Sequence, residues 1–221
     1  MNIEKLYDNR FSESEQKTKN EMWKVLCDSF FSKYIPENAT VLDPAAGYCE
    51  FINNITIKGS GKRIASDLNT EMKDHASPGV ETHIASADKL TFVEDNSVDV
   101  IFISNFLEHL RSKDEVLAVL TEFKRVLKPG GVFLAMQPNI RFVYNEYWDF
   151  FDHYTALSDR SYAEALSLVG GFKLKQMIPK FMPYTTKGGL PVNPFLVKMY
   201  LMFRPAWKIM GKQFFAVAVK E

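Results

Sequence analysis

The sequence predicts an α/β fold in which a mostly parallel sheet carries helices on both faces. Apolar runs of strand length, such as 98–103, alternate along the chain with longer segments of helical periodicity, such as 116–127. The run 98–103 is apolar at nearly every position and rich in β-branched residues, as expected of a strand covered on both faces. Parallel neighbours require long crossovers, and the alternation supplies them.

The stretch 39–67 is the most informative part of the chain. The apolar run 40–42 leads into Asp43, a loop of small residues follows at 44–49, a helix begins near Glu50, and a second apolar run ends at Asp67. Small residues let a loop approach a ligand, and the following helix offers unpaired N–H groups. An acid about 20 residues further on can accept hydrogen bonds from ribose hydroxyls. The stretch therefore predicts a nucleoside-binding crossover.

Two acidic residues flank this loop, Asp43 before it and Glu50 after it. Carboxylates would repel the pyrophosphate of a dinucleotide but tolerate a cofactor that carries an ammonium and a sulfonium group. The charges therefore favour S-adenosylmethionine over NAD. The alternative roles are a strand-end acid that caps the loop for Asp43 and an ordinary turn glycine for Gly47.

The segments after the loop continue the pattern. A predicted strand at 81–86 is followed by Ala87 and Asp88, and the strand 98–103 runs into the polar segment 104–106. Ser112 and Glu115 fit a capping box at a helix start, and the Lys-Pro-Gly-Gly segment 128–131 ends that helix and opens a strand at 132–136. Strands are also expected at 172–178 and 213–219.

At five consecutive motifs this series resembles the class I S-adenosylmethionine-dependent methyltransferases. The loop of that family usually reads Gly-x-Gly-x-Gly, whereas here Ala45 and Cys49 stand at the outer positions and only Gly47 is kept. The resemblance implies a Rossmann-like, seven-stranded, mostly parallel sheet, S-adenosylmethionine as cofactor, and methyltransferase activity. The departure in the loop keeps open a binding-only relative without catalysis, and an NAD-dependent oxidoreductase on a similar sheet is the other alternative.

The resemblance also implies a role for each cofactor residue. Asp67 would bind the ribose hydroxyls and Asp88 the adenine amine, although Asp88 could instead be a helix N-cap. Arg10 would pair with the methionyl carboxylate, or be a solvated arginine. Cys49 would fill a glycine position, although a reactive thiol is conceivable in a helix-starting loop. The full set of predicted cofactor residues is Arg10, Asp43, Ala45, Gly47, Cys49, Asp67, Leu68, Ala87, Asp88, Ser104, Asn105 and Phe106.

The aromatic segment 137–162 is the predicted substrate region. Aromatic rings alternate there with hydrogen-bonding side chains, which suits a polar ring such as a sugar. The stretch resembles a subgroup of small bacterial methyltransferases associated with surface-polysaccharide or glycoside biosynthesis, which implies O-methylation of a sugar or glycoside. Packing of Tyr147, Trp148, Phe150 and Phe151 into a lid is the alternative. The predicted substrate residues are Asn139, Arg141, Tyr144, Tyr147 and Trp148.

A hydroxyl acceptor must lose a proton, so O-methylation requires a base. His153 is the first choice because histidine titrates near neutrality, Asp152 is the second and His109 the third. His109 could equally be a packed or solvent-facing histidine. The pattern Asp149-x-x-Asp152-His153 could hold a divalent ion, but no further ligand set is evident and no metal is predicted.

Composition sets the wider limits. The chain has 221 residues, 46% of them hydrophobic, and equal numbers of basic and acidic residues, which disfavours nucleic acid as an obligatory partner. We expect one domain: a helical cap at 1–36, a cofactor half at 37–136 and a substrate half at 137–221. Two cysteines and the absence of a signal sequence or membrane span favour the cytoplasm. Oligomeric state is undetermined.

The segment 194–212 permits two interpretations. Pro194 starts a predicted helix that carries aromatic and basic residues, and Pro205 should bend or break it. An ordinary lid with a solvated face is the expected structure. Contact with a membrane surface, which would suit a lipid-linked acceptor, is the alternative.

Overall fold

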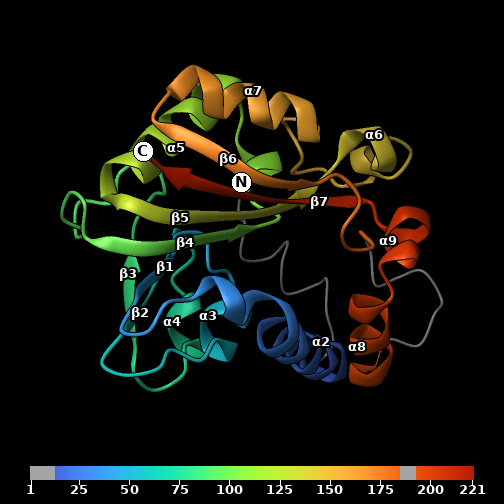
Figure 1. Ribbon diagram of the computed structural model, residues 1–221, viewed down its shortest axis with the longest axis horizontal. Helices are drawn as coiled ribbons and strands as arrows, with labels where there is room; N and C mark the ends of the chain where they lie inside the picture. Colours follow the sequence, from blue (N-terminus) through green and yellow to red (C-terminus); the bar gives the residue numbers. More distant parts are fainter. Residues whose placement is uncertain (1–12, 185–192) are drawn as a thin grey trace.

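A single seven-stranded sheet forms the centre of the molecule. The computed structural model describes residues 13–184 and 193–221 (Figure 1). The strand order is β3-β2-β1-β4-β5-β7-β6. Neighbouring strands from β3 through β5 are parallel, whereas β7 is antiparallel to both β5 and β6. The strands are β1 Thr40–Asp43, β2 Lys62–Asp67, β3 Val80–Ile84, β4 Val98–Ser104, β5 Leu127–Pro138, β6 Phe172–Ile178 and β7 Gln213–Lys220.

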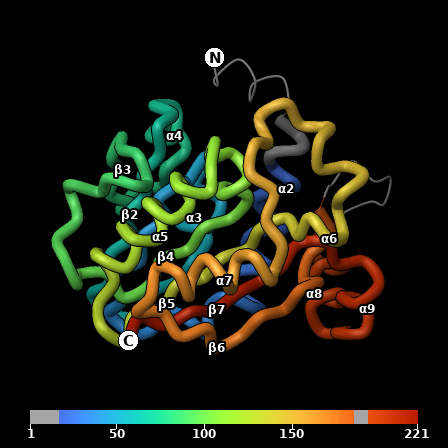
Figure 2. Tube along the Cα trace, turned by 90° about the horizontal axis from the view of Figure 1, so that it is seen from above, coloured from blue at the N-terminus to red at the C-terminus, as the bar shows by residue number. Residues whose placement is uncertain are grey.

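Helices cover both faces of this sheet, as the sequence predicted. In Figure 1, α5 and α7 lie above the sheet, and α2, α3, α4 and α8 lie below it. Figure 2 shows α6, α8 and α9 together at one end of the molecule. The α-helices are α2 Glu13–Leu26, α3 Glu50–Asn54, α4 Met72–His75, α5 Lys113–Val126, α6 Ile140–Val143, α7 Asp159–Val169, α8 Pro194–Met202 and α9 Arg204–Met210. Shorter helical turns lie at Cys27–Phe31, Ser32–Tyr34, Leu107–His109 and Tyr147–Asp149.

Alternation along the strands divides the core into two layers. Val100 and Phe102 of β4 belong to the cluster beneath α2 and α3, whereas Ile101 and Ile103 belong to the cluster beneath α5 and α7. Successive side chains of a strand point to opposite faces, so one strand supplies both layers. Helix α2 of the N-terminal cap packs on the lower layer, where Trp23 lies 5.8 Å from Phe102, measured between ring centroids.

Several element boundaries differ from the sequence predictions. Strand β3 ends at Ile84, two residues before the predicted end. Helix α7 begins at Asp159, where Ser158 caps it and Ser161 is the N3 partner that bonds back. Strand β5 begins at Leu127, and the ladder with β4 shifts register across 128–131. The predicted break at Pro205 is confirmed, since α8 ends before it and α9 starts around it.

Candidate functional site

The loop between β1 and α3 is held by the acid that ends β2. Gly47 N donates to Asp67 Oδ2 at 2.8 Å, and Asn69 N donates to Asp67 Oδ1 at 2.9 Å. Gly47 has a φ of +52°, which glycine adopts readily, and a Cβ placed there would meet no atom of the described residues within 4 Å. Among these residues the loop is therefore uncovered at Gly47, as a backbone that approaches a ligand requires.

Cys49 occupies a glycine-like conformation at the start of α3. Its φ is 61°, in the left-handed region, and its side chain is fully buried with Sγ 3.6 Å from the Met72 carbonyl. Burial, together with the charges of Asp43 and Glu50, raises the pKa of the thiol to about 12. Cys49 is therefore a neutral thiol at physiological pH, which favours the packing role over the reactive one.

Three carboxylates surround this loop. Asp43 is buried, and burial together with the charges of Glu50 and Asp67 raises its pKa well above the ordinary value. Lys19 forms an ion pair with Glu50 at 2.7 Å. A second cation beside Asp43 would relieve the cost of ionising it. The three carboxylates therefore suit the ammonium and sulfonium groups of S-adenosylmethionine and disfavour a pyrophosphate.

The carboxyl end of β4 lies beside this loop because β4 pairs with β1. Strands β2 and β3 extend the sheet on one side of β1, whereas β4 and β5 extend it on the other side. Open α/β sheets bind ligands at such a topological switch point. Asn105 has a φ of +47°, and its side chain donates to Ser104 Oγ at 3.4 Å. Backbone N–H groups of Phe106 and Leu107 donate to Gln137 Oε1, which fixes the segment after the strand.

The residues predicted beside the adenine lie in different environments. Leu68 is 64% exposed, and Ala87 is buried. Asp88 is exposed and accepts a hydrogen bond from Ser86 Oγ, in a turn that Lys89 N closes on the Ser86 carbonyl. The alternative role of Asp88 as a helix N-cap is wrong, because no helix begins there in the described structure. Arg10 lies outside the described residues.

The three predicted bases meet in space although His109 and His153 are far apart in sequence. His109 Nδ1 lies 3.0 Å from the Asp152 carbonyl oxygen and 3.3 Å from Asp152 Oδ2. The ring centroids of His109 and His153 are 5.2 Å apart. His153 is buried, its Nδ1 lies 2.8 Å from the Tyr147 carbonyl, and its Nε2 lies 3.4 Å from the Tyr184 hydroxyl.

Glu108 is a fourth member of this group that the sequence prediction omitted. Glu108 is only 3% exposed, and its Oε2 has no hydrogen-bond partner within residues 13–184 and 193–221. Burial raises its pKa to about 7, partly offset by the nearby His109. The sequence contained a signal for it, because Glu108 directly precedes His109 in the segment that follows a buried strand.

The same residues offer a possible cation site. Glu108, His109 and His153 present ligand atoms that all lie within 4.8 Å of one another. Two imidazoles and a carboxylate are donors that divalent transition metals accept. This set differs from the predicted Asp149-x-x-Asp152-His153 pattern, of which it contains only His153.

Three of the predicted substrate residues have structural partners instead. Asn139 is fully buried and donates to Asp159 Oδ1 and to the Pro179 carbonyl, while Arg141 pairs with Asp159 at 2.9 Å. Tyr147 is fully buried and donates to the Thr155 carbonyl, so it cannot serve as an open stacking surface. Burial keeps Asn139 and Tyr147 away from solvent, whereas Arg141 is exposed, and a substrate role for these residues stays a prediction.

The other aromatic residues of the segment do reach solvent. Tyr144 is 65% exposed, Trp148 is 59% exposed and Phe151 is 77% exposed. Trp148 also contacts the buried Tyr147 ring edge-on, with centroids 5.0 Å apart. The lid-packing alternative thus holds for Tyr147, whereas Trp148 and Phe151 are available for a ligand.

Sequence comparison identifies the central part of the chain. A family model described as a methyltransferase domain matches residues 42–135. Over 122 residues the chain is 30% identical to the mitochondrial 2-methoxy-6-polyprenyl-1,4-benzoquinol methylase of Dictyostelium discoideum, covering 52% of this chain and 34% of that protein. Over 110 residues it is 33% identical to the ubiquinone/menaquinone biosynthesis C-methyltransferase UbiE of Hahella chejuensis, covering 45% and 43%. The chain spans less than half the length of these relatives.

Comparison with solved structures finds similar folds over nearly the whole chain. An S-adenosylmethionine-dependent methyltransferase from Archaeoglobus fulgidus superposes with a TM-score of 0.66 at 18% identity, covering 94% of this chain and 97% of that one. Identity this low shows a shared fold, and the family match adds the domain. Residues 42–135 therefore match a methyltransferase domain, and the chain has the fold of the S-adenosylmethionine-dependent methyltransferases.

Proposed function

We propose that the chain transfers a methyl group from S-adenosylmethionine to a hydroxyl-bearing ring, with a sugar or glycoside as the first candidate acceptor. The observation that carries this proposal is the group formed by His109, Asp152 and His153. Two histidines and a carboxylate gathered after the carboxyl end of β4 are more than the fold requires. They supply the proton acceptor that methylation of a hydroxyl needs.

The cofactor residues act by binding and orientation. Asp43 and Glu50 would face the cationic part of the cofactor, Asp67 would accept from the ribose hydroxyls, and Asn105 would lie beneath the sulfonium. When bound, S-adenosylmethionine supplies a methyl carbon already activated by a sulfonium. The chain then has to align the acceptor with that carbon and exclude competing water.

His153 remains the preferred base. A carbonyl only accepts hydrogen bonds, so the contact with the Tyr147 carbonyl assigns the proton to Nδ1 and leaves Nε2 as the basic nitrogen. The same reasoning places a proton on Nδ1 of His109, which contacts the Asp152 carbonyl. Asp152 and His109 are the second and third candidates. The exposed Trp148 would stack on the ring of the acceptor.

A quinol is the second candidate acceptor. The observation in its favour is the similarity to the two curated relatives, whose names describe benzoquinol and quinone methylation. A quinol, like a sugar, is a ring with hydroxyl groups, but it is aromatic and can be methylated on carbon. Incubation with S-adenosylmethionine and a panel of glycosides and quinols, followed by mass spectrometry, distinguishes the two acceptors.

Binding and turnover must be measured separately. Calorimetry should show binding of S-adenosylhomocysteine and not of NAD, and binding without any methylated product would favour the binding-only alternative. His153→Ala should lower turnover by about 10²–10⁴-fold and leave S-adenosylhomocysteine affinity nearly unchanged, because a base acts on the acceptor.

Three variants complete this test. His83→Ala, which removes a histidine from β3, is the matched control and should keep parental turnover. His153→Gln with a parental circular dichroism spectrum guards against a folding defect. Trp148→Ala should raise the KM for the acceptor. Parental turnover in both His153 variants removes this residue from the mechanism.

A further inference from the structure

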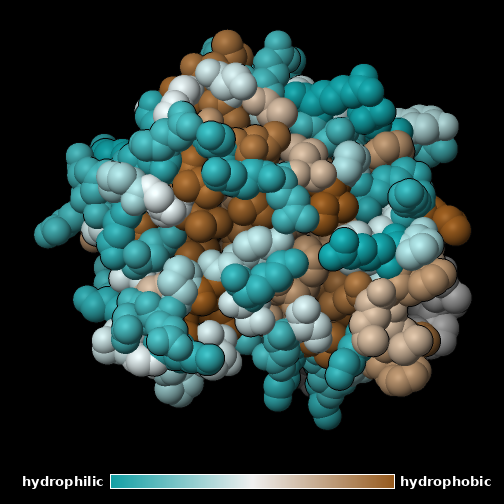
Figure 3. Space-filling view, viewed as in Figure 1, coloured by the Kyte–Doolittle hydropathy of each residue, from teal (hydrophilic) through white to brown (hydrophobic). Residues whose placement is uncertain are grey.

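Helices α8 and α9 present an unusually apolar outer surface. Phe195 is 69% exposed, Met202 72%, Phe203 60% and Ile209 81%. Figure 3 shows hydrophobic atoms gathered at the lower right of the molecule, over these two helices. Single exposed apolar residues are common, whereas a contiguous group marks an interaction surface. The α8–α9 surface consists of Phe195, Leu196, Met199, Met202, Phe203, Ile209 and Met210.

These exposed residues are not needed to attach the helices. Val197 and Leu201 of α8 and Trp207 of α9 are buried in the lower core layer. Trp207 Nε1 donates to the Tyr200 carbonyl at 2.8 Å, and Tyr200 donates to the Phe181 carbonyl at 2.6 Å. The helix pair is thus anchored on its inner side, and its outer side is apolar as well. An ordinary lid with a solvated face would carry polar residues there.

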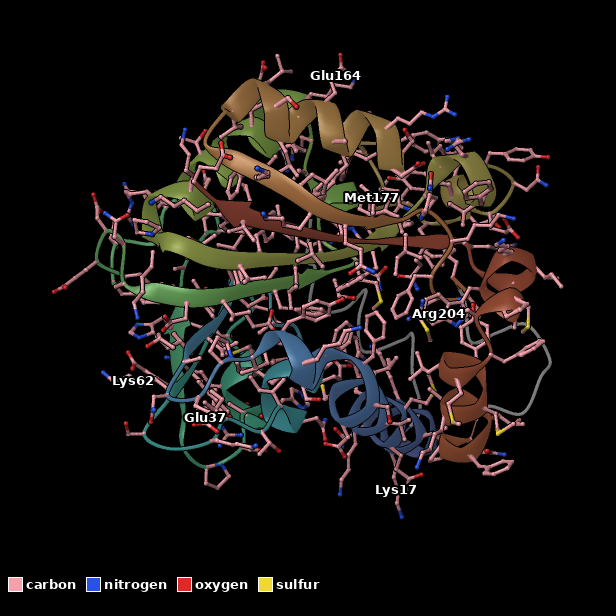
Figure 4. The ribbon with its side chains drawn as sticks, in the orientation of Figure 1. Lys17, Glu37, Lys62, Glu164, Met177 and Arg204 are labelled. Atoms are coloured by element: carbon pink, nitrogen blue, oxygen red, sulfur yellow. The ribbon has the colours of Figure 1, made fainter. Side chains whose placement is uncertain are left out.

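The charge of this region is entirely positive. Between Glu164 and Glu221 the sequence contains no acidic residue, although the whole chain has a net charge of +0. Lys198, Arg204 and Lys208 are exposed on the two helices. Figure 4 marks Arg204 at the junction of α8 and α9, where its guanidinium lies 5.8 Å from the Trp207 ring. Basic residues interspersed among exposed aromatic and aliphatic ones are typical of helices that lie at a lipid interface.

We propose that the α8–α9 surface docks onto an anionic lipid bilayer. The apolar residues would enter the interface between headgroups and acyl chains, and Lys198, Arg204 and Lys208 would contact lipid phosphates. No described helix has the length and apolar character to cross a membrane, so the contact is peripheral. Both views place α8 and α9 at the same end as α6, which follows the carboxyl end of β5. Docking there would turn the ligand-binding edge of the sheet toward the lipid.

Cosedimentation with vesicles tests this proposal without any methylation assay. The full chain should sediment with vesicles of phosphatidylcholine mixed with phosphatidylglycerol, and less with pure phosphatidylcholine, because positive charge contributes only on an anionic surface. Lys198→Gln with Lys208→Gln should weaken binding to the mixed vesicles about 30-fold, since each lysine near the surface contributes about 1 kcal/mol and about 1.4 kcal/mol corresponds to a factor of ten. Met202→Asp with Ile209→Asp should abolish sedimentation with both vesicle types.

Matched controls lie elsewhere on the surface. Lys173→Gln with Lys175→Gln removes two exposed lysines from β6, and Leu168→Asp alters a residue of α7 that is 71% exposed; both should bind vesicles like the parent. All variants should retain a parental circular dichroism spectrum, because the altered side chains face outward. The proposal is overturned if the parent does not sediment, if the α8–α9 variants sediment like the parent, or if the same substitutions instead dissolve a lipid-free dimer in gel filtration.

Discussion

Asp67→Ala offers the sharpest test of the proposed cofactor site, because one carboxylate holds the loop and is also proposed to bind the ligand. In the structure its two oxygens accept from Gly47 N at 2.8 Å and from Asn69 N at 2.9 Å. A hydrogen bond to a charged group contributes about 1.5–3 kcal/mol, and partial exposure of Asp67 lets water replace some of it. We expect the free energy of unfolding to fall by about 1–3 kcal/mol, which lowers the melting temperature by about 2–4 °C per kcal/mol.

The affinity for S-adenosylhomocysteine should fall by a similar amount for a separate reason. In the proposed site the substitution removes the acceptor for the ribose hydroxyls, which corresponds to about 1–3 kcal/mol, or about 5–150-fold in Kd. Isothermal titration calorimetry measures the affinity, and thermal denaturation without ligand measures the stability.

Asp99→Ala is the matched control. Asp99 also accepts a backbone hydrogen bond, from Thr40 N at 2.8 Å, and pairs with Lys128, but it lies at the opposite end of its strand from the ligand edge. The Asp99→Ala protein should lose stability and keep its affinity for S-adenosylhomocysteine. Parental affinity in Asp67→Ala, or an equal loss of affinity in Asp99→Ala, would refute the assignment.

Three further predictions follow from the same geometry. Cys49→Gly should keep or improve S-adenosylhomocysteine affinity, because glycine adopts the left-handed conformation without strain; loss of turnover in a folded Cys49→Gly protein would contradict the packing role. The pKa of Glu108 is raised to about 7, so the parent should lose stability as pH rises from the unfolded pKa of about 4.5 through 7. Glu108→Gln should therefore gain stability relative to the parent over that range, by up to about 3 kcal/mol in urea denaturation series, and a pH-independent difference would show that Glu108 titrates normally. Gly211→Ala should destabilise the fold by about 1–3 kcal/mol, because its Cβ would lie 2.5 Å from the Trp207 carbonyl oxygen; parental stability of this variant in urea denaturation would exclude the collision.

Local sequence patterns determined the order of the elements and the position of the loop between β1 and α3. Apolar runs and breakers are properties of neighbouring residues, so the strands ending at Asp43, Asp67 and Ser104 were predicted close to their observed positions. The small-residue loop and its flanking acids were predicted for the same reason. The left-handed conformation of Cys49 explains in physical terms why that position usually holds glycine.

Only the tertiary structure decided which distant side chains meet and which way they face. His109 follows β4, whereas Asp152 and His153 lie beyond β5, and their contact depends on how the segment after β5 folds back. The same turn buries Tyr147 and Asn139 while leaving Trp148 exposed, although all three were predicted to bind the acceptor. The apolar surface of α8 and α9 was likewise undecided, because residue types show that a helix is apolar and only packing shows how much of that surface remains uncovered.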